Sequence, residues 1–295
     1  EISLGLVGSE MCIRDRKELK ETRNYLLTVD KTKTWNQGAV ARSFGLYTIV
    51  SYPDFRMTEA FGNRKRLGDN AFFSQCREKM ENGEIWRSDE NVFIQMVTYS
   101  GHSPFKMPES LKTVHFSNRI PEIMADYMTV AHYTDEAIGK FVEYLRTRPE
   151  YGRTMVVITG DHEGLADNRK DLCRTKAGKG IVSENEFTPF IVLNSPIAMY
   201  HTKVMGQVDI YTTLLNLLGL ESYRWSGIGQ SILDSGKPGV AISPKRSIEG
   251  DTMFLSREEL LRMRQSQVIS DRIIRFDKLK DLRSVSYTHL TLPTT

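Results

Sequence analysis

Two short segments carry residue types that can bind metal ions and anions, and each directly follows a predicted strand. One is GDHEG at residues 160–164, after an apolar run at residues 154–159. Its adjacent carboxylate and imidazole, Asp161 and His162, suit a divalent cation such as Mn²⁺ or Zn²⁺. The flanking glycines permit the sharp turn that would point both side chains into one pocket. An ordinary Asp-Gly turn beside a histidine is the alternative interpretation.

The other segment is YSGHSPF at residues 99–105, after the run NVFIQMVT at residues 91–98. His102 could donate a hydrogen bond to an anionic substrate or to a leaving group; a histidine with structural contacts alone is the alternative. Ligands of open α/β sheets bind beyond the carboxyl ends of parallel strands. We therefore expect His102 and the Asp161–His162 pair to leave the same edge of one sheet.

The elements that must position these segments form a mainly parallel α/β sheet in our interpretation. Continuous apolar runs predict strands covered on both faces at residues 91–98, 154–159 and 187–193. The last contains Pro189, which is typical of an edge or of a strand start. Residues 17–90 show no sustained period, so short helices and loops are expected there, including a helix near residues 70–80.

Helices are predicted where apolar residues recur at spacings of three and four. The longest such stretch runs from residue 119 to residue 146, long enough to cross a whole sheet. A second helix is expected over residues 207–218, with Asp209 as its cap and Gly219 directly after its end. Its inward side chains are expected to be Tyr211, Leu214, Leu215 and Leu218. From about residue 253 the chain is basic and amphipathic.

The composition excludes several classes of protein. The 295 residues include 40 Lys and Arg against 37 Asp and Glu, and 40% are hydrophobic, as in a soluble globular domain. A net charge of +3 without a dense basic stripe argues against nucleic acid as a partner. No run reaches the ~20 apolar residues of a membrane-spanning helix, and 3 cysteines without a CxxC pair indicate neither a disulfide framework nor a zinc clip.

Both ends of the chain differ in character from the body. Residues 1–16 and 284–295 resemble translated sequencing-adapter DNA of the kind that occurs at the ends of unrelated conceptual translations, and we set them aside. A natural frayed terminus is the alternative. The body, residues 17–283, need not have natural ends and is interpreted as one incomplete catalytic domain.

Several stretches together resemble the sulfatase-like branch of the alkaline phosphatase superfamily. They are FIQMVTYSGHSPF at 93–105, YTDEAIG at 133–139, GDH at 160–162, TPF at 188–190 and GQVDIYTTLLNLLG at 206–219. Their order and spacing look most like the lipoteichoic acid synthase and phosphoglycerol transferase group, from about Trp35 to Leu233. The resemblance implies an alkaline-phosphatase-like α/β/α sandwich with a mainly parallel sheet, of which residues 17–283 are the C-terminal portion.

The resemblance also implies roles for individual residues. Asp161 and His162 would ligate a divalent metal, manganese in most members, with zinc, magnesium and calcium as alternatives. His102 would contact the phosphate head group. Trp35 matches a tryptophan that lines the head-group site, whereas Gln37 stands where the family has an arginine. Because arginine binds phosphate through two parallel hydrogen bonds, its loss weakens the case for glycerol phosphate.

Other family features have no counterpart here. A family histidine that precedes the tryptophan is absent between Asn24 and Asn36. The family's nucleophile is a threonine on a loop after an early strand, with an acidic metal ligand before it. We expect no strand–loop–helix setting between residue 17 and Trp35, and Thr22, Thr28 and Thr32 lie too close to the Trp35 segment. No catalytic nucleophile is therefore assigned in this chain, and it is expected upstream.

The function that the resemblance implies is a metal-dependent phosphoglycerol or phosphoryl transferase. A threonine hydroxyl would attack phosphorus, and a second acceptor would then take the group. The substrate would be an anionic phospholipid head group or a cell-envelope glycan, and the catalytic domain would lie outside the cytoplasm, anchored to the bacterial cell membrane. The alternatives are a sulfatase or phosphodiester hydrolase of the same superfamily, and a non-catalytic head-group-binding module. The sequence does not indicate an oligomeric state.

Overall fold

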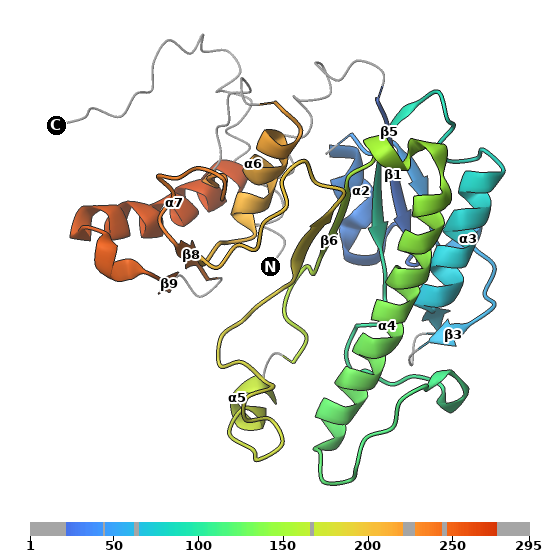
Figure 1. Ribbon diagram of the computed structural model, residues 1–295, viewed down its shortest axis with the longest axis horizontal. Helices are drawn as coiled ribbons and strands as arrows, with labels where there is room; N and C mark the ends of the chain where they lie inside the picture. Colours follow the sequence, from blue (N-terminus) through green and yellow to red (C-terminus); the bar gives the residue numbers. More distant parts are fainter. Residues whose placement is uncertain are drawn as a thin grey trace. The chain divides into compact units, whose positions relative to one another are not determined.

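The computed structural model is shown in Figure 1. It describes residues 22–43, 45–61, 65–165, 168–220, 228–243 and 247–275. The two adapter-like ends, residues 1–16 and 284–295, lie outside these ranges. The chain divides into two units, one of Lys20–Ser195 and one of Glu1–Leu19 with Pro196–Thr295, and each is described by itself.

A three-stranded parallel sheet is the centre of the first unit, Lys20–Ser195. Strand β1 (Thr22–Thr28) lies between β2 (Thr48–Val50) and β5 (Asn91–Val97). Both neighbours run parallel to β1, and Leu27 is the register partner of Val50 on one side and of Met96 on the other. The carboxyl ends of all three strands therefore lie at the same edge of this sheet. The strand predicted at residues 91–98 is confirmed.

Helices cover both faces of this sheet, as the sequence predicted. On one face, α3 (Asp69–Glu81) and α4 (Glu122–Thr147) lie side by side (Figure 1). Their core contains Tyr25 and Leu27 of β1 together with aromatic side chains of both helices. On the other face, α2 (Gln37–Ser43) contributes Ala41 to a smaller cluster with Leu26. Because successive strand residues point to opposite faces, this alternation makes an α/β/α sandwich.

The central strand β1 is the main element that the sequence analysis missed, since only helices and loops were expected over residues 17–90. Its apolar stretch is just Tyr25-Leu26-Leu27, preceded by the polar residues Thr22, Arg23 and Asn24. So short a run has no readable period. The strand exists because its partners are β2 and β5, and β5 lies more than sixty residues away along the chain.

Strands β6 (Val156–Thr159) and β7 (Phe190–Leu193), which were expected in the mainly parallel sheet, are an exception to that arrangement. They pair antiparallel with one another, as a two-stranded sheet with hydrogen bonding separate from that of β2-β1-β5. They are only partly covered, and Ile191 is 47% exposed. A parallel return needs a crossover element over the sheet. Between β6 and β7, however, the described chain offers only α5 (Arg169–Leu172), which packs against α4.

The segment between β6 and β7 folds against α4. Leu165 and Leu172 are buried in a second core cluster with Phe105, from the loop after β5, and Met124 of α4. This cluster therefore joins the two loops that follow β5 and β6.

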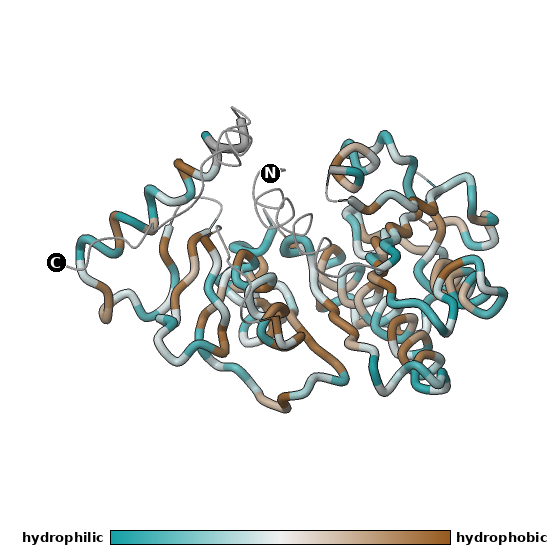
Figure 2. Tube along the Cα trace, turned by 90° about the horizontal axis from the view of Figure 1, so that it is seen from above, coloured by the Kyte–Doolittle hydropathy of each residue, from teal (hydrophilic) through white to brown (hydrophobic). Residues whose placement is uncertain are grey.

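The second unit contains α6 (Val208–Leu217), the antiparallel pair β8 (Val240–Ile242) and β9 (Ile248–Gly250), and α7 (Arg257–Arg275). The prediction of a helix at residues 207–218 is confirmed, and Gly219 follows it with a left-handed φ of 72°. Hydrophobic and hydrophilic residues alternate along α7 (Figure 2), as expected for the basic amphipathic segment.

Two details of α6 differ from the prediction. Gln207 occupies the cap position, and Asp209 lies in the first turn, where its carboxylate accepts the backbone N–H groups of Gly206 and Gln230 and pairs with Lys237 at 3.0 Å. Of the four side chains expected to face inward, only Leu215 is buried.

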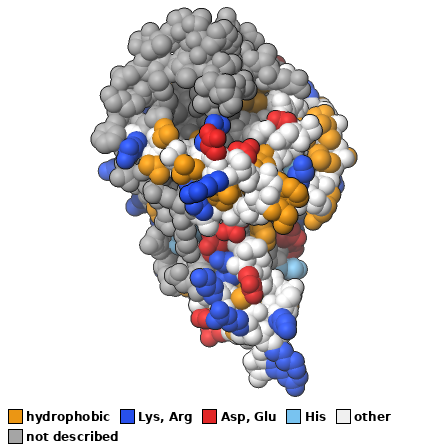
Figure 3. Space-filling view, turned by 90° about the vertical axis from the view of Figure 1, so that its left-hand side faces the viewer, with side chains coloured by type: hydrophobic (Ala, Val, Ile, Leu, Met, Phe, Trp, Pro, Cys, Tyr) orange, Lys and Arg blue, Asp and Glu red, His pale blue; other side chains and the backbone are white. Residues whose placement is uncertain are grey.

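The remaining short elements lie within one unit or the other. They are the antiparallel pair β3 (Ala60–Phe61) and β4 (Arg66–Leu67), and the 3-10 turns Thr34–Asn36, Tyr52–Asp54, Glu109–Leu111, Pro149–Arg153 and Thr252–Phe254. Within the described ranges, no helix combines the length and the apolar character needed to cross a bilayer. The face drawn in Figure 3 intersperses basic, acidic and hydrophobic side chains and shows no continuous basic stripe.

Candidate functional site

The structure brings Trp35 and His102 together at the carboxyl edge of the parallel sheet. The ring of His102 stacks on Trp35, with centroids 5.8 Å apart, and on Tyr99, with centroids 5.2 Å apart. Tyr99 is 8% exposed and Trp35 is 49% exposed, and His102 is also exposed. The imidazole is therefore fixed from the protein side and remains open to a ligand.

One nitrogen of His102 is held by the backbone. Its Nδ1 lies 2.6 Å from the carbonyl oxygen of Ser103. Because a carbonyl oxygen only accepts, Nδ1 carries the proton and donates this hydrogen bond. The second ring nitrogen, Nε2, is consequently the atom that can accept from a hydroxyl or, when protonated, donate to an anion.

The backbone at Trp35 is strained. Trp35 and Asn36 both adopt left-handed φ values, 48° and 58°, a conformation that costs a residue with a β-carbon roughly 1–2 kcal/mol. Backbone hydrogen bonds from Asn36 to the carbonyl of Lys33 and from Gly38 to that of Thr32 hold the turn. Strain of this kind clusters at ligand sites, and here it places the indole against His102.

A buried carboxylate positions the loop that carries His102. Asp69, at the start of α3, is fully buried, and its Oδ1 accepts the backbone N–H groups of Tyr99 at 3.3 Å and Ser100 at 3.0 Å. Its Oδ2 accepts the hydroxyl of Thr134 on α4 at 2.9 Å. Ser100 Oγ in turn accepts the backbone N–H of Asp69 at 3.1 Å. Asp69 thus fixes the chain two to three residues before His102.

The YTDEAIG stretch at residues 133–139 has a structural role in this arrangement. The Tyr133 hydroxyl donates to the Glu59 carboxylate and accepts the backbone N–H of Asn70 at 3.0 Å. Burial, with the adjacent Glu59 carboxylate, raises the pKa of the Tyr133 phenol. Tyr133 and Thr134 therefore tie α4 to the first turn of α3, and so to the His102 loop.

The Asp161–His162 pair lies on the exposed turn that follows β6. Asp161 Oδ1 accepts the backbone N–H of His162 at 2.9 Å, and its Oδ2 lies 3.6 Å from His162 Nε2. The side chains are 90% and 75% exposed. Because β6 is not hydrogen-bonded to β5, the expectation that this pair and His102 leave one sheet is wrong. The two loops are joined instead through α4.

The pair could supply two ligands of a divalent metal. His162 Nδ1 lies 2.9 Å from the carbonyl oxygen of Glu163, so Nδ1 donates this bond and Nε2 is the ring nitrogen that could bind a metal. Such a backbone partner is the usual way in which a ligating histidine is oriented. Within the residues that the structure describes, no group of three or more His, Cys, Asp or Glu side chains is placed to hold a metal.

Tyr127 of α4 links the two loops. Its ring meets Phe105, three residues after His102, edge-on with centroids 5.2 Å apart. A Cβ atom built on Gly164, two residues after His162, would collide with the same ring. Burial and the negative charge of Glu163 raise the pKa of the Tyr127 phenol. The glycine thus lets the turn after β6 lie flat on Tyr127.

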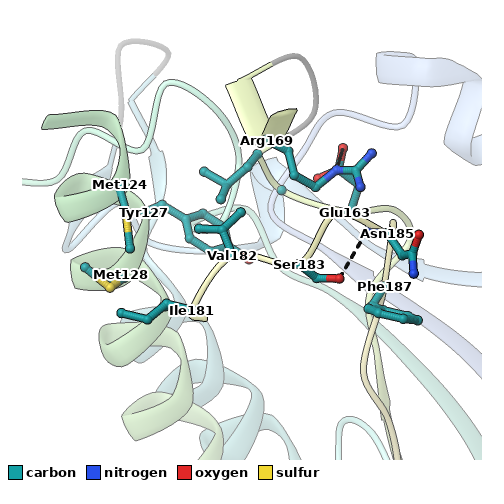
Figure 4. Close-up of a pocket in the computed structure, with 12 residues that line it drawn as sticks. Met124, Tyr127, Met128, Glu163, Arg169, Ile181, Val182, Ser183, Asn185 and Phe187 are labelled. Atoms are coloured by element: carbon teal, nitrogen blue, oxygen red, sulfur yellow. Dashed lines mark hydrogen bonds and ion pairs between the residues drawn. The ribbon is translucent and has the colours of Figure 1, made fainter. Parts of the chain in front are cut away.

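A cavity of ≈ 230 Å³ opens beside this turn (Figure 4). Met124 and Met128 of α4 form one wall, and Ile181, Val182 and Phe187 approach from the segment between β6 and β7 (Figure 4). Polar lining comes from a compact charge cluster. The buried Arg169 pairs with Glu186 at 3.1 Å, lies 3.9 Å from Glu163, and donates to the carbonyl oxygen of Glu184.

Gln37, which replaces the family arginine, is engaged within the fold. Thr28 at the end of β1 is fully buried, and its hydroxyl donates to Gln37 Oε1 at 2.9 Å. Strand β1 and the loop after it precede Trp35, where the sequence analysis expected no strand, whereas helix α2 begins only after Trp35. Thr28 is nevertheless buried and hydrogen-bonded, and does not present a nucleophile.

Three residues of this edge were not found from the sequence: Asp30, Arg66 and Asp69. Asp30 follows β1 and is 2% exposed, and its Oδ1 pairs with Arg66 Nη2 at 2.5 Å. Single acids and bases of this kind have no pattern of their own. Recognising Asp30 required β1 to be predicted first, because its place beyond a strand end is its only distinguishing feature.

Known proteins are similar to this chain in sequence. The lipoteichoic acid synthase-like protein YvgJ of Bacillus subtilis is 22% identical over 80% of this chain and 39% of that protein. Lipoteichoic acid synthase of Staphylococcus aureus (strain USA300) is 23% identical over 68% of this chain and 31% of that protein. The chain thus spans about two fifths or less of the length of these relatives.

Solved structures of low identity share the fold. The lipoteichoic acid synthase LtaP from Listeria monocytogenes superposes with a TM-score of 0.65, at 15% identity, over 91% of this chain and 74% of that one. A protein in the alkaline phosphatase superfamily from Vibrio parahaemolyticus gives 0.62, at 15% identity, over 97% and 73%. The sequence also matches the Sulfatase family over residues 24–220. The chain therefore belongs to the sulfatase family, with an alkaline-phosphatase-like fold.

Proposed function

We propose that this chain is part of a metal-dependent transferase that moves a phosphoglycerol or phosphoryl group from a lipid head group or to a cell-envelope glycan. The observation that carries the proposal is the stacking of His102 on Trp35, open to solvent at the carboxyl edge of the sheet. The named relatives, which are lipoteichoic acid synthases, support it. By the same likeness, we place the domain outside the cytoplasm of a bacterial cell, at its membrane.

Each part of the site has a task in this proposal. Trp35 offers an apolar face to the glycerol carbons, and His102 Nε2 contacts the phosphate or a hydroxyl of the head group. Asp161 and His162 would hold a divalent cation, which supplies positive charge to the phosphoryl oxygens and activates an attacking hydroxyl. We assign that hydroxyl to a threonine upstream of residue 17, together with a further metal ligand, and we expect residues 1–295 alone to be inactive.

The head-group site can be tested on this chain by isothermal titration with glycerol 1-phosphate. We expect binding that weakens about tenfold or more in His102→Ala, since a hydrogen bond to a charged group is lost, and that also weakens in Trp35→Ala. His115→Ala, on an exposed loop residue, is the matched control and should bind as the parent does. Equal affinity in all four proteins would contradict the proposal.

Inorganic sulfate provides the comparison with the sulfatase alternative. A transferase for phosphoglycerol should prefer glycerol 1-phosphate, because the glycerol carbons add contact with Trp35 that sulfate cannot make. A site that binds sulfate as tightly, with no gain from the glycerol, would favour a sulfatase instead.

A further inference from the structure

Arg66 lies in the same cluster as the head-group residues, although nothing in the sequence pointed to it. Its Nη2 pairs with Asp30, which follows β1, at 2.5 Å. Its Cζ lies 6.0 Å from the centroid of the Tyr99 ring, and Tyr99 stacks on His102. The Arg66 side chain is 14% exposed. A guanidinium therefore stands at the carboxyl edge of the sheet, one ring away from His102.

The guanidinium of Arg66 supplies positive charge that a site for phosphate requires. A phosphate monoester carries up to two negative charges, and planar guanidinium groups bind it best because their N–H groups match its oxygens in pairs. Gln37, at the position of the family arginine, is neutral and accepts the Thr28 hydroxyl. The neighbouring Lys31 places its Nζ over the ring of Tyr52, 5.7 Å from the centroid. Of the basic side chains that the structure describes at this edge, Arg66 is the one that contacts the stacked rings of Tyr99 and His102.

The donors of Arg66 exceed what its carboxylate partner uses. A guanidinium has five N–H groups, and the ion pair with Asp30 is made through Nη2. The buried Nε has no hydrogen-bond partner in the structure, an uncommon state for a buried donor. Asp30 and Tyr99 thus orient the guanidinium while leaving some of its donors uncommitted.

We infer that Arg66 contacts the phosphate of the head group in this chain and supplies the cation that Gln37 does not. The inference rests on the proposed function. The pair with Asp30 fixes the plane of the guanidinium, and the remaining N–H groups bind phosphate oxygens beside His102. Arg66 in the β3–β4 hairpin thus supplies the specificity for a phosphate-bearing head group, and the segment that follows Trp35 does not.

Titration calorimetry with glycerol 1-phosphate and with inorganic phosphate tests this inference on the full chain. Arg66→Gln should weaken both by about 10- to 100-fold, because a charge-assisted contact to phosphate is removed. Arg56→Gln is the matched control, since Arg56 forms an exposed pair with Glu78 at 2.6 Å, and it should leave both affinities unchanged. Affinities for both probes that match the parent in Arg66→Gln would overturn the inference.

A second variant distinguishes direct contact between Arg66 and phosphate from a role of Arg66 in holding Asp30 in place. In Arg66→Gln with Gln37→Arg, the cation returns at the family position, and glycerol 1-phosphate affinity should recover by about tenfold. If Arg66 only holds Asp30 in place, this double variant stays as weak as the single one, which would contradict the inference. Because Arg66→Gln removes the guanidinium that pairs with the buried Asp30 carboxylate, Asp30→Asn with Arg66→Gln serves as the variant of restored stability, and it should still bind weakly.

The two proposals fail in different ways. If the parent chain binds glycerol 1-phosphate through His102 and Trp35 but Arg66→Gln binds equally well, only the role of Arg66 is wrong. If the parent chain binds neither phosphate probe, the head-group site itself is wrong, and the role of Arg66 is wrong with it.

Discussion

The buried carboxylate of Asp69 gives the sharpest prediction for the architecture of the site. Asp69 accepts three hydrogen bonds, from two backbone N–H groups of the His102 loop and from Thr134. Counted singly, a hydrogen bond to a charged group contributes about 1.5–3 kcal/mol. The three share one carboxylate and do not add, so we expect Asp69→Ala to lower the free energy of unfolding by about 3–5 kcal/mol, as when one partner of a buried charged contact is removed.

The isosteric change Asp69→Asn should cost much less. Its amide oxygen can still accept from Tyr99 and Ser100, and the Thr134 hydroxyl can rotate to accept from the amide nitrogen. The charge is lost but the bonds remain, so about 1–2 kcal/mol is expected. Urea denaturation followed by circular dichroism measures both variants, with Asp135→Ala, an exposed neighbour on α4, as a control within about 0.5 kcal/mol of the parent.

The same variants report on the loop that carries His102. Glycerol 1-phosphate should bind more weakly to Asp69→Ala than to Asp69→Asn, because only the alanine releases the backbone at Tyr99 and Ser100. The reasoning would be refuted by an Asp69→Ala protein as stable as the parent, or by an asparagine as damaging as the alanine. If Asp69→Ala does not fold, Thr134→Val, which removes one of the three bonds, should cost about 1–1.5 kcal/mol.

Three further predictions concern other parts of the fold. In a chain extended upstream of residue 17, Mn²⁺ titration should show tight binding that is lost in Asp161→Ala and in His162→Ala, and equal affinity in all three proteins would reject the metal assignment. Gly164→Ala should destabilise the protein by about 1–3 kcal/mol, because the added methyl group collides with Tyr127. Gly139→Ala, in open space on α4, should instead stabilise it by about 0.5–1 kcal/mol. Thermal unfolding measures both changes in stability, and two changes of the same sign would contradict the described packing of Gly164 on Tyr127. In a Cys12→Ser background, iodoacetamide should label the partly exposed Cys173 in the native protein and Cys76 only after unfolding, because burial raises the pKa of the Cys76 thiol. Raising the pH from 7 to 9 should therefore not make Cys76 reactive in the native protein. Mass spectrometry that finds Cys76 labelled in the native protein would show the core to be looser than described.

The elements predicted well from the sequence are those whose own pattern determines them. The long helix α4 and the helix α6 are predicted by the spacing of their apolar residues, and β5 by a continuous run of β-forming residues. Strand β1 is not predicted in this way, because its three apolar residues form a strand only when they pair with β2 and β5. The orientation of β6 against β7 also depends on the path of the chain between them, which no local period encodes.

The residues of the candidate site were likewise predicted only in part from the sequence. Trp35 and His102 were both assigned to the head-group site through the family resemblance, and in the structure their rings stack on one another. Asp69 and Arg66 could not be predicted, because a lone acid at a helix start is typical of a cap and a lone arginine in a hairpin is typical of the surface. Their place in the site comes from contacts between residues about thirty or more apart in sequence.

The most direct test of the proposed transferase is turnover of a phosphatidylglycerol analogue by a chain extended upstream of residue 17. We predict Mn²⁺-dependent release of the lipid product by the extended chain, and loss of that release in Asp161→Ala, His162→Ala and His102→Ala. Residues 1–295 alone should release none. Turnover by residues 1–295, or undiminished turnover in the three variants, would contradict the account.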